Sequence, residues 1–68
     1  MAQNTKARVE FAPDGEHYHK IKEGTTGNMW TYFTANPTLR EQLLLNPQAK
    51  FRLRGETGII IGILPRGS

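Results

Sequence analysis

The sequence contains no cysteine, which excludes both disulfides and thiolate metal ligands. Many domains of this size depend on one of those cross-links, and oligomerisation is the usual remaining route to stability. At 68 residues the chain is also too short for the large enzyme architectures. We therefore expect a single small domain over residues 6–64, with flexible ends at 1–5 and 65–68, and we expect it to form oligomers.

Long apolar segments are absent too. The longest apolar run, from Ile59 to Leu64, has six residues, whereas a helix needs about 20 to cross a bilayer. The first residues of the chain lack the apolar stretch of a secretory signal. These absences predict a cytoplasmic protein that makes no membrane contact.

Side chains suited to catalysis are scarce. The one aspartate, Asp14, lies in a Pro-Asp-Gly turn, and the one serine, Ser68, is the last residue. No threonine occupies a strained turn of the Gly-x-Ser-x-Gly kind, and so small a domain rarely encloses a pocket of several hundred Å3. We predict that the protein is not an enzyme and holds no cofactor.

The first third of the chain predicts a β-hairpin. Charged and apolar residues alternate strictly from Lys6 to Phe11, which is typical of a strand with one buried face. Residues 12–15, Ala-Pro-Asp-Gly, favour a tight turn. The return strand is predicted over residues 16–22 and a loop over residues 24–27.

The middle of the chain predicts helix. Residues 28–33 carry three of the six aromatic side chains and fit either a helix or a strand, and we favour a short helix. The next helix has a clear start, because Asn36 can cap it and Pro37 suits its first position. Pro47 predicts that it ends at residue 45 or 46.

The sequence of residues 36–51 is Asn-Pro-Thr-Leu-Arg-Glu-Gln-Leu-Leu-Leu-Asn-Pro-Gln-Ala-Lys-Phe. This segment resembles the helix-rich stretch of nitrile-hydratase-type leader peptides. Those leaders share the two proline-started segments around Leu-Arg-x-x-Leu-Leu. The resemblance covers about a quarter of the chain, and the isoleucine-rich ending lacks the Cys, Ser and Thr of a modified core peptide. Its one structural implication is an alternative in which Pro47 opens a second short helix.

The last third predicts a second hairpin. Apolar and basic residues alternate over residues 49–54, residues 55–58 form a turn, and residues 59–64 are apolar throughout except at Gly62. The expected fold is α+β, a small antiparallel sheet of about four strands in two hairpins packed against one main helix, in the order β-β-(α)-α-β-β. The predicted core consists of Val9, Phe11, Ile21, Trp30, Phe33, Leu39, Leu43, Leu44, Phe51, Leu53, Ile59, Ile61 and Ile63.

Two histidines, His17 and His19, would share one face of the return strand, with Glu10 and Glu23 as the nearest acidic residues. A zinc site needs at least three protein ligands in a defined geometry. We therefore interpret the pair as surface histidines and predict no metal site.

Basic residues give the clearest functional pattern. Lys50, Arg52 and Arg54 would occupy one face of a strand, and further cations on neighbouring strands would extend it, namely Lys6, Arg8, Lys20 and Lys22. Such a face suits phosphate contacts, and Tyr18 and Tyr32 offer stacking surfaces. The alternative is a solvated face that discourages aggregation. Nucleic-acid binding is accordingly the second functional hypothesis.

The first hypothesis rests on the C-terminal strand. A strand that is apolar on both faces needs cover on both faces, and the chain contains little to provide it. We expect the cover to come from another protein chain or from a second copy of this one. The predicted interface residues are Ile59, Ile60, Ile61, Ile63 and Leu64.

Overall fold

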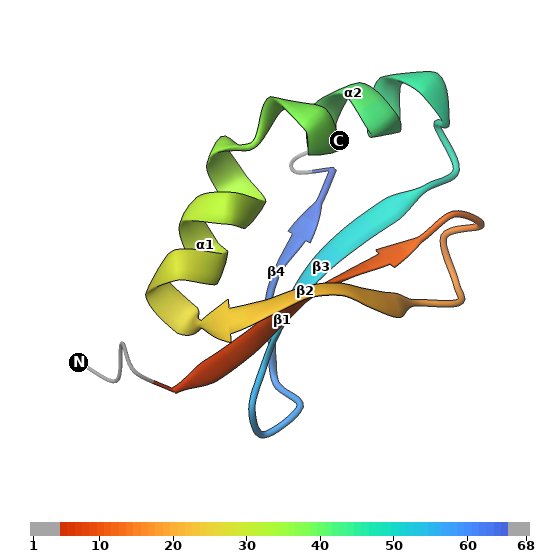
Figure 1. Ribbon diagram of the computed structural model, residues 1–68. Coiled ribbons are helices and arrows are strands. Elements are labelled where there is room, and N and C mark those ends of the chain that lie inside the picture. Colours follow the sequence, from red (N-terminus) through yellow and green to blue (C-terminus); the bar gives the residue numbers. More distant parts are fainter. Residues whose placement is uncertain (1–4, 66–68) are drawn as a thin grey trace.

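The computed structural model describes residues 5–65. Four strands form one antiparallel sheet in the order β2-β1-β3-β4, with both helices on one of its faces (Figure 1). The predicted α+β class with two hairpins is confirmed, and neither helix is long and apolar enough to span a bilayer within the described residues. The elements are β1 (Lys6–Ala12), β2 (His19–Thr25), α1 (Thr26–Ala35), α2 (Pro37–Leu45), β3 (Lys50–Gly55) and β4 (Ile60–Leu64). Of the predicted flexible ends, residues 1–4 and 66–68 lie outside the described residues.

Strand β2 begins three residues later than predicted, at His19 instead of residue 16. The cause is Asp14, whose Oδ1 accepts hydrogen bonds from the backbone N–H groups of Glu16 and His17, both at 2.8 Å. These bonds continue the turn after Gly15, whose φ of 81° is in the left-handed region. The local hydrogen bonds therefore replace strand pairing at residues 16 and 17.

The loop predicted over residues 24–27 is wrong, because β2 continues to Thr25 and α1 starts at Thr26. Gly24 and Thr25 pair with the beginning of β1, and Thr25 then caps α1 by accepting a hydrogen bond from the N–H of Asn28. The Met29 side chain lies 2.9 Å from where a Cβ on Gly24 would stand, so the glycine permits this close approach. The favoured helix at residues 28–33 is confirmed as part of α1.

Helix α2 forms as predicted. The side chain of Asn36 accepts a hydrogen bond from the N–H of Thr38, Pro37 takes the first helical position, and the helix ends at Leu45. The alternative second helix from Pro47 does not form, because residues 47–48 are a turn and β3 begins at Lys50. Asn46 fixes this turn, since its Nδ2 donates to the carbonyl of Pro13 at 3.1 Å.

The core lies between the helices and one face of the sheet. Five predicted core residues are buried there, and Phe11 and Leu43 are partly buried against them; the five are Val9, Phe33, Leu39, Phe51 and Leu53. Two small residues of β1, Ala7 and Ala12, and Met29 are also buried. The remaining predictions are wrong, since these side chains are at least 40% exposed: Ile21, Trp30, Leu44, Ile59, Ile61 and Ile63.

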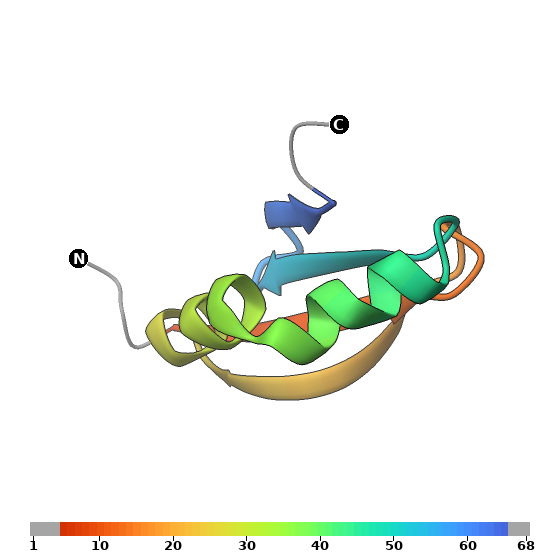
Figure 2. The same ribbon diagram turned by 90° about the horizontal axis from the view of Figure 1, so that it is seen from above.

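Those exposed residues reflect the width of the helical layer. The two helices follow one another in a single row that lies over the middle of the sheet (Figure 2). A helix with its side chains is about 10 Å wide, whereas four strands at about 4.8 Å spacing extend over nearly twice that width. Helix α1 accordingly packs mainly on β1, β2 and β3, and β4 lies at the margin of the layer.

Replacement of Leu53 by alanine is expected to lower the free energy of unfolding by about 2–5 kcal/mol, because this side chain is fully buried in the middle of the sheet. The matched control is Leu44→Ala, where the side chain is 82% exposed, with an expected change below about 0.5 kcal/mol. Urea unfolding at one fixed protein concentration measures both. Equal losses in the two variants would contradict the assigned core.

Candidate functional site

The face of the sheet opposite the helices concentrates positive charge. Strand alternation and cross-strand pairing place Arg8 opposite Glu23 and Arg54, and Glu10 opposite Lys20 and Arg52. We call this surface the basic face; its charged residues are Lys6, Arg8, Glu10, Lys20, Glu23, Lys50, Arg52 and Arg54. Six cations and two carboxylates give it a formal charge of +4, compared with +3 for the whole chain.

The sheet thus brings together six of the seven cations predicted for this surface. Lys22 is the exception, because it pairs with Val9 and therefore faces the helices. Its Nζ lies 5.3 Å from the centre of the Tyr32 ring of α1. Strand β2 contains a bulge at the point where its pairing partner changes from Val9 to Glu10. The bulge inserts one extra residue, so Lys20 and Lys22 lie on opposite faces of the sheet, although their spacing in the sequence predicted one shared face.

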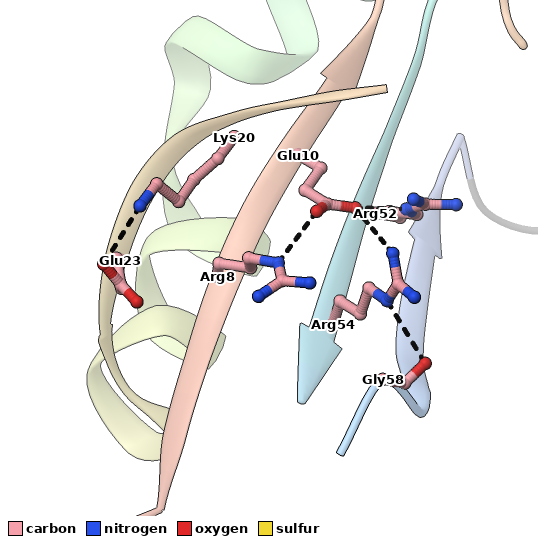
Figure 3. Close-up of polar contacts among 7 residues, drawn as sticks. All are labelled: Arg8, Glu10, Lys20, Glu23, Arg52, Arg54 and Gly58. Carbon is pink, nitrogen blue, oxygen red and sulfur yellow. Dashed lines mark hydrogen bonds and ion pairs between the residues drawn. The ribbon is translucent and has the colours of Figure 1, made fainter. Parts of the chain in front are cut away.

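A single carboxylate, Glu10, organises the centre of the basic face (Figure 3). Its Oε2 accepts a hydrogen bond from Arg8 Nε at 2.8 Å, and its Oε1 accepts one from Arg52 Nε at 2.5 Å. Arg54 Nη1 lies 3.9 Å from the same Oε1. Glu10 is only 7% exposed, and these contacts with three guanidinium groups compensate for its burial.

Two opposing effects act on the pKa of Glu10. Burial raises the pKa, but the hydrogen bonds and positive charges of Arg52 and Arg8 together outweigh burial and leave the pKa below its ordinary value. The carboxylate therefore stays ionised at neutral pH and holds the arginines of β1 and β3 side by side. Without this charge, Arg8 and Arg54 would repel each other across the strand pair.

The other contacts of the arginines fix their positions further. Arg54 Nε donates to the carbonyl of Gly58 at 3.2 Å, which ties the guanidinium to the turn between β3 and β4. The guanidinium carbon of Arg52 lies 3.8 Å from the centre of the Tyr18 ring, in a cation–π stack. Tyr18 lies in the segment before β2, although the sequence pattern predicts that this segment is part of the strand.

A small hollow of about 70 Å3 lies at one end of the basic face. Three of the cations line it, Lys6, Arg8 and Arg54, and two carboxylates also border it, Glu23 and Glu56. Glu23 is held on the other side by Lys20, whose Nζ is 3.1 Å from Glu23 Oε1. The lining residues thus include one more cation than carboxylates.

The two histidines lie in different environments. His17 precedes β2 and its Nδ1 contacts Asp14 Oδ2 at 2.5 Å, which raises the pKa of His17 and lowers that of Asp14. His19 pairs with Phe11 and meets its ring edge-on at 5.9 Å, on the helix side of the sheet. The predicted sharing of one strand face by the two histidines is therefore wrong. Within residues 5–65 no group of three His, Asp or Glu side chains is arranged to hold a metal ion.

The second candidate surface is the outer side of β4, together with the residue that precedes it. We call it the isoleucine edge; its residues, with their exposed fractions, are Ile59 (67%), Ile60 (40%), Ile61 (40%) and Ile63 (48%). Ile60 and Ile63 pair with Arg54 and Arg52 and so border the basic face. The fifth predicted interface residue, Leu64, pairs with Phe51 and is 6% exposed, so it belongs to the core.

Trp30, which the sequence predicted to be in the core, contributes to this edge. The indole ring lies 3.4 Å from where a Cβ on Gly62 would stand and is still 44% exposed. Gly62 was the available signal, because a glycine inside a strand often marks the close approach of another group. Trp30 therefore extends the apolar surface from β4 onto the helix side.

The sheet has two edge strands, and they differ in charge. The exposed residues of β2 include Lys20, Lys22 and Glu23, and such charges discourage pairing with another chain. Strand β4 contains no charged residue, and three of its five residues are exposed isoleucines. One edge of the sheet is thus protected and the other is not.

The variant Glu10→Gln is expected to lower the free energy of unfolding at pH 7 by about 1–2 kcal/mol, because three arginines lose their common partner. Because the pKa of Glu10 in the folded state is below its ordinary value of 4.5, the stabilisation by the ionised carboxylate is complete above pH 4.5. This stabilisation is lost as the pH falls through the pKa that Glu10 has in the folded protein. The difference between wild type and variant should therefore narrow below pH 4.5. Urea unfolding across pH 3–7 measures it, with the exposed Glu41→Gln as the control expected to change little at pH 7.

The chain therefore carries two surfaces suited to binding, the basic face and the isoleucine edge, and they meet along the pairing of β3 with β4. The basic face has fixed guanidinium groups, and the isoleucine edge has exposed aliphatic side chains on an outer strand. No family model, curated protein or solved structure matches this sequence.

Proposed function

We propose that this protein is a non-enzymatic assembly subunit of the cytoplasm that forms a homodimer by pairing β4 with β4 of a second copy. The observation that carries the proposal is the isoleucine edge, where four isoleucines are 40–67% exposed on and beside an unprotected outer strand. Exposed apolar side chains of this number on one element are typical of an interface.

The backbone of β4 supports the same pairing. β4 is last in the strand order, so its outer N–H and C=O groups have no strand beside them among the described residues. An edge of this kind is a template for adding a strand from another chain. Main-chain hydrogen bonds would supply affinity, and the isoleucines would gain cross-strand neighbours that shield part of their apolar surface from water.

A second copy is the partner that this edge fits best. When two identical strands pair antiparallel, a two-fold axis relates the two copies. Each contact between one residue of the first copy and another residue of the second then occurs twice, so the surface is self-complementary. That axis stands perpendicular to the sheet, so the two helical layers lie on one side and the two basic faces on the other. The eight strands would then form one continuous sheet, with Ile60 and Ile63 near its centre.

The proposal is tested by light-scattering mass measurement and sedimentation equilibrium. We expect a particle with twice the 7.7 kDa chain mass for the wild type. The variant Ile60→Lys should raise the dissociation constant at least about tenfold, because the new charge lies in the interface and loses water there.

Ile21→Lys is the matched control, since Ile21 lies on the opposite edge strand β2 and has the same 40% exposure as Ile60. This variant should remain dimeric. Circular dichroism verifies that both variants are folded. A wild-type protein that is monomeric at about 100 μM, or equal dissociation of the two variants, would refute the proposal.

A further inference from the structure

We propose that the basic face binds single-stranded nucleic acid, with its phosphates on the arginines and lysines and a base stacked at Tyr18. This inference does not require β4 pairing, because every residue it uses belongs to one copy of the chain. The basic face is also open, since both helices lie on the opposite side of the sheet (Figures 1 and 2).

The charge of the basic face is the first argument. Its formal charge of +4 exceeds that of the entire chain, so the fold concentrates cations on one side. Lys6, Lys20 and Lys50 are exposed near its margins, and the arginines occupy its centre. A phosphate backbone that crosses such a face releases its condensed counterions, which provides binding free energy without a need for a particular sequence.

The second argument concerns the hydrogen-bond donors that are left for phosphate. A guanidinium group has five N–H donors, and Glu10 accepts only the Nε–H of Arg8 and of Arg52. The Nη groups of both residues can therefore donate to a further anion while the bond to Glu10 holds their orientation. Preorganisation of this kind reduces the entropy that is lost on binding. The hollow lined by Lys6, Arg8 and Arg54, which Glu23 and Glu56 also border, is the proposed position of one phosphate group.

The third argument favours nucleic acid over an acidic polypeptide. The guanidinium carbon of Arg52 lies 3.8 Å from the centre of the Tyr18 ring, beside the other cations of the basic face, and Tyr18 is only partly buried. Nucleobases stack on tyrosine rings and on guanidinium planes, whereas acidic side chains have no flat surface to match. A sheet face presents no helix or ribbon to enter the groove of a duplex, so the unpaired strand is the better fit.

Fluorescence anisotropy with a labelled oligothymidylate of about 12 nucleotides tests the inference. Affinity should fall steeply as the salt concentration rises from about 50 to about 200 mM. Lys50→Gln should reduce the magnitude of the slope of log K against log salt by about 0.7, the contribution of one phosphate contact to a single strand. Arg40→Gln, on α2 and away from the basic face, should leave the slope unchanged.

A second variant separates stacking from charge. Tyr18→Leu should weaken binding about tenfold with no change in the salt slope, because it removes a ring and no cation.

The absence of binding at about 100 μM protein in low salt would overturn the inference, as would equal effects of Lys50→Gln and Arg40→Gln. Tighter binding of a duplex, or of polyglutamate of equal charge, would overturn it in favour of those ligands. Light scattering without oligonucleotide reports on dimerisation alone, and anisotropy of Lys50→Gln and Tyr18→Leu reports on nucleic-acid binding, so failure of one proposal is distinguishable from failure of the other.

Discussion

A mismatch of width between two layers underlies the surface of this protein. Four strands require a covering layer nearly twice as wide as one helix, and the chain provides a single row of helices. That row lies over β1, β2 and β3 and contributes Met29, Phe33 and Leu39 to the core. The isoleucines of β4 and the whole opposite face of the sheet remain exposed, whereas Leu64 of β4 reaches the core. Both candidate binding surfaces are direct results of this limit.

The two uncovered regions are adapted to water in different ways. The basic face is charged, and its only buried charge, Glu10, is satisfied by arginines from two strands. Every buried side-chain nitrogen and oxygen within the described residues has a hydrogen-bond partner. The isoleucine edge has no such adaptation, since its side chains are aliphatic and its backbone is unpaired on one side. The contrast is why assembly is the proposed role of the edge and polyanion binding that of the face.

Local patterns in the sequence were sufficient for most of the secondary structure. The strict alternation in β1 and β3 and the capping residues of α2 identify these elements because each depends on neighbours within a few residues. Errors arose where a distant or side-chain contact decided the outcome. Asp14 delayed β2 through bonds to the backbone, and pairing of Gly24 with Ala7 extended that strand into a predicted loop.

The candidate site was predictable in part. The sequence by itself determined that Lys50, Arg52 and Arg54 share one strand face and that residues 59–64 are apolar, because both follow from a period of two along one segment. Only the tertiary structure decided that Glu10 lies among the arginines, that Lys22 faces the helices, and that Trp30 stays half exposed over Gly62. Register, bulges and the reach of a helical layer set these placements, and all three depend on residues far apart in the chain.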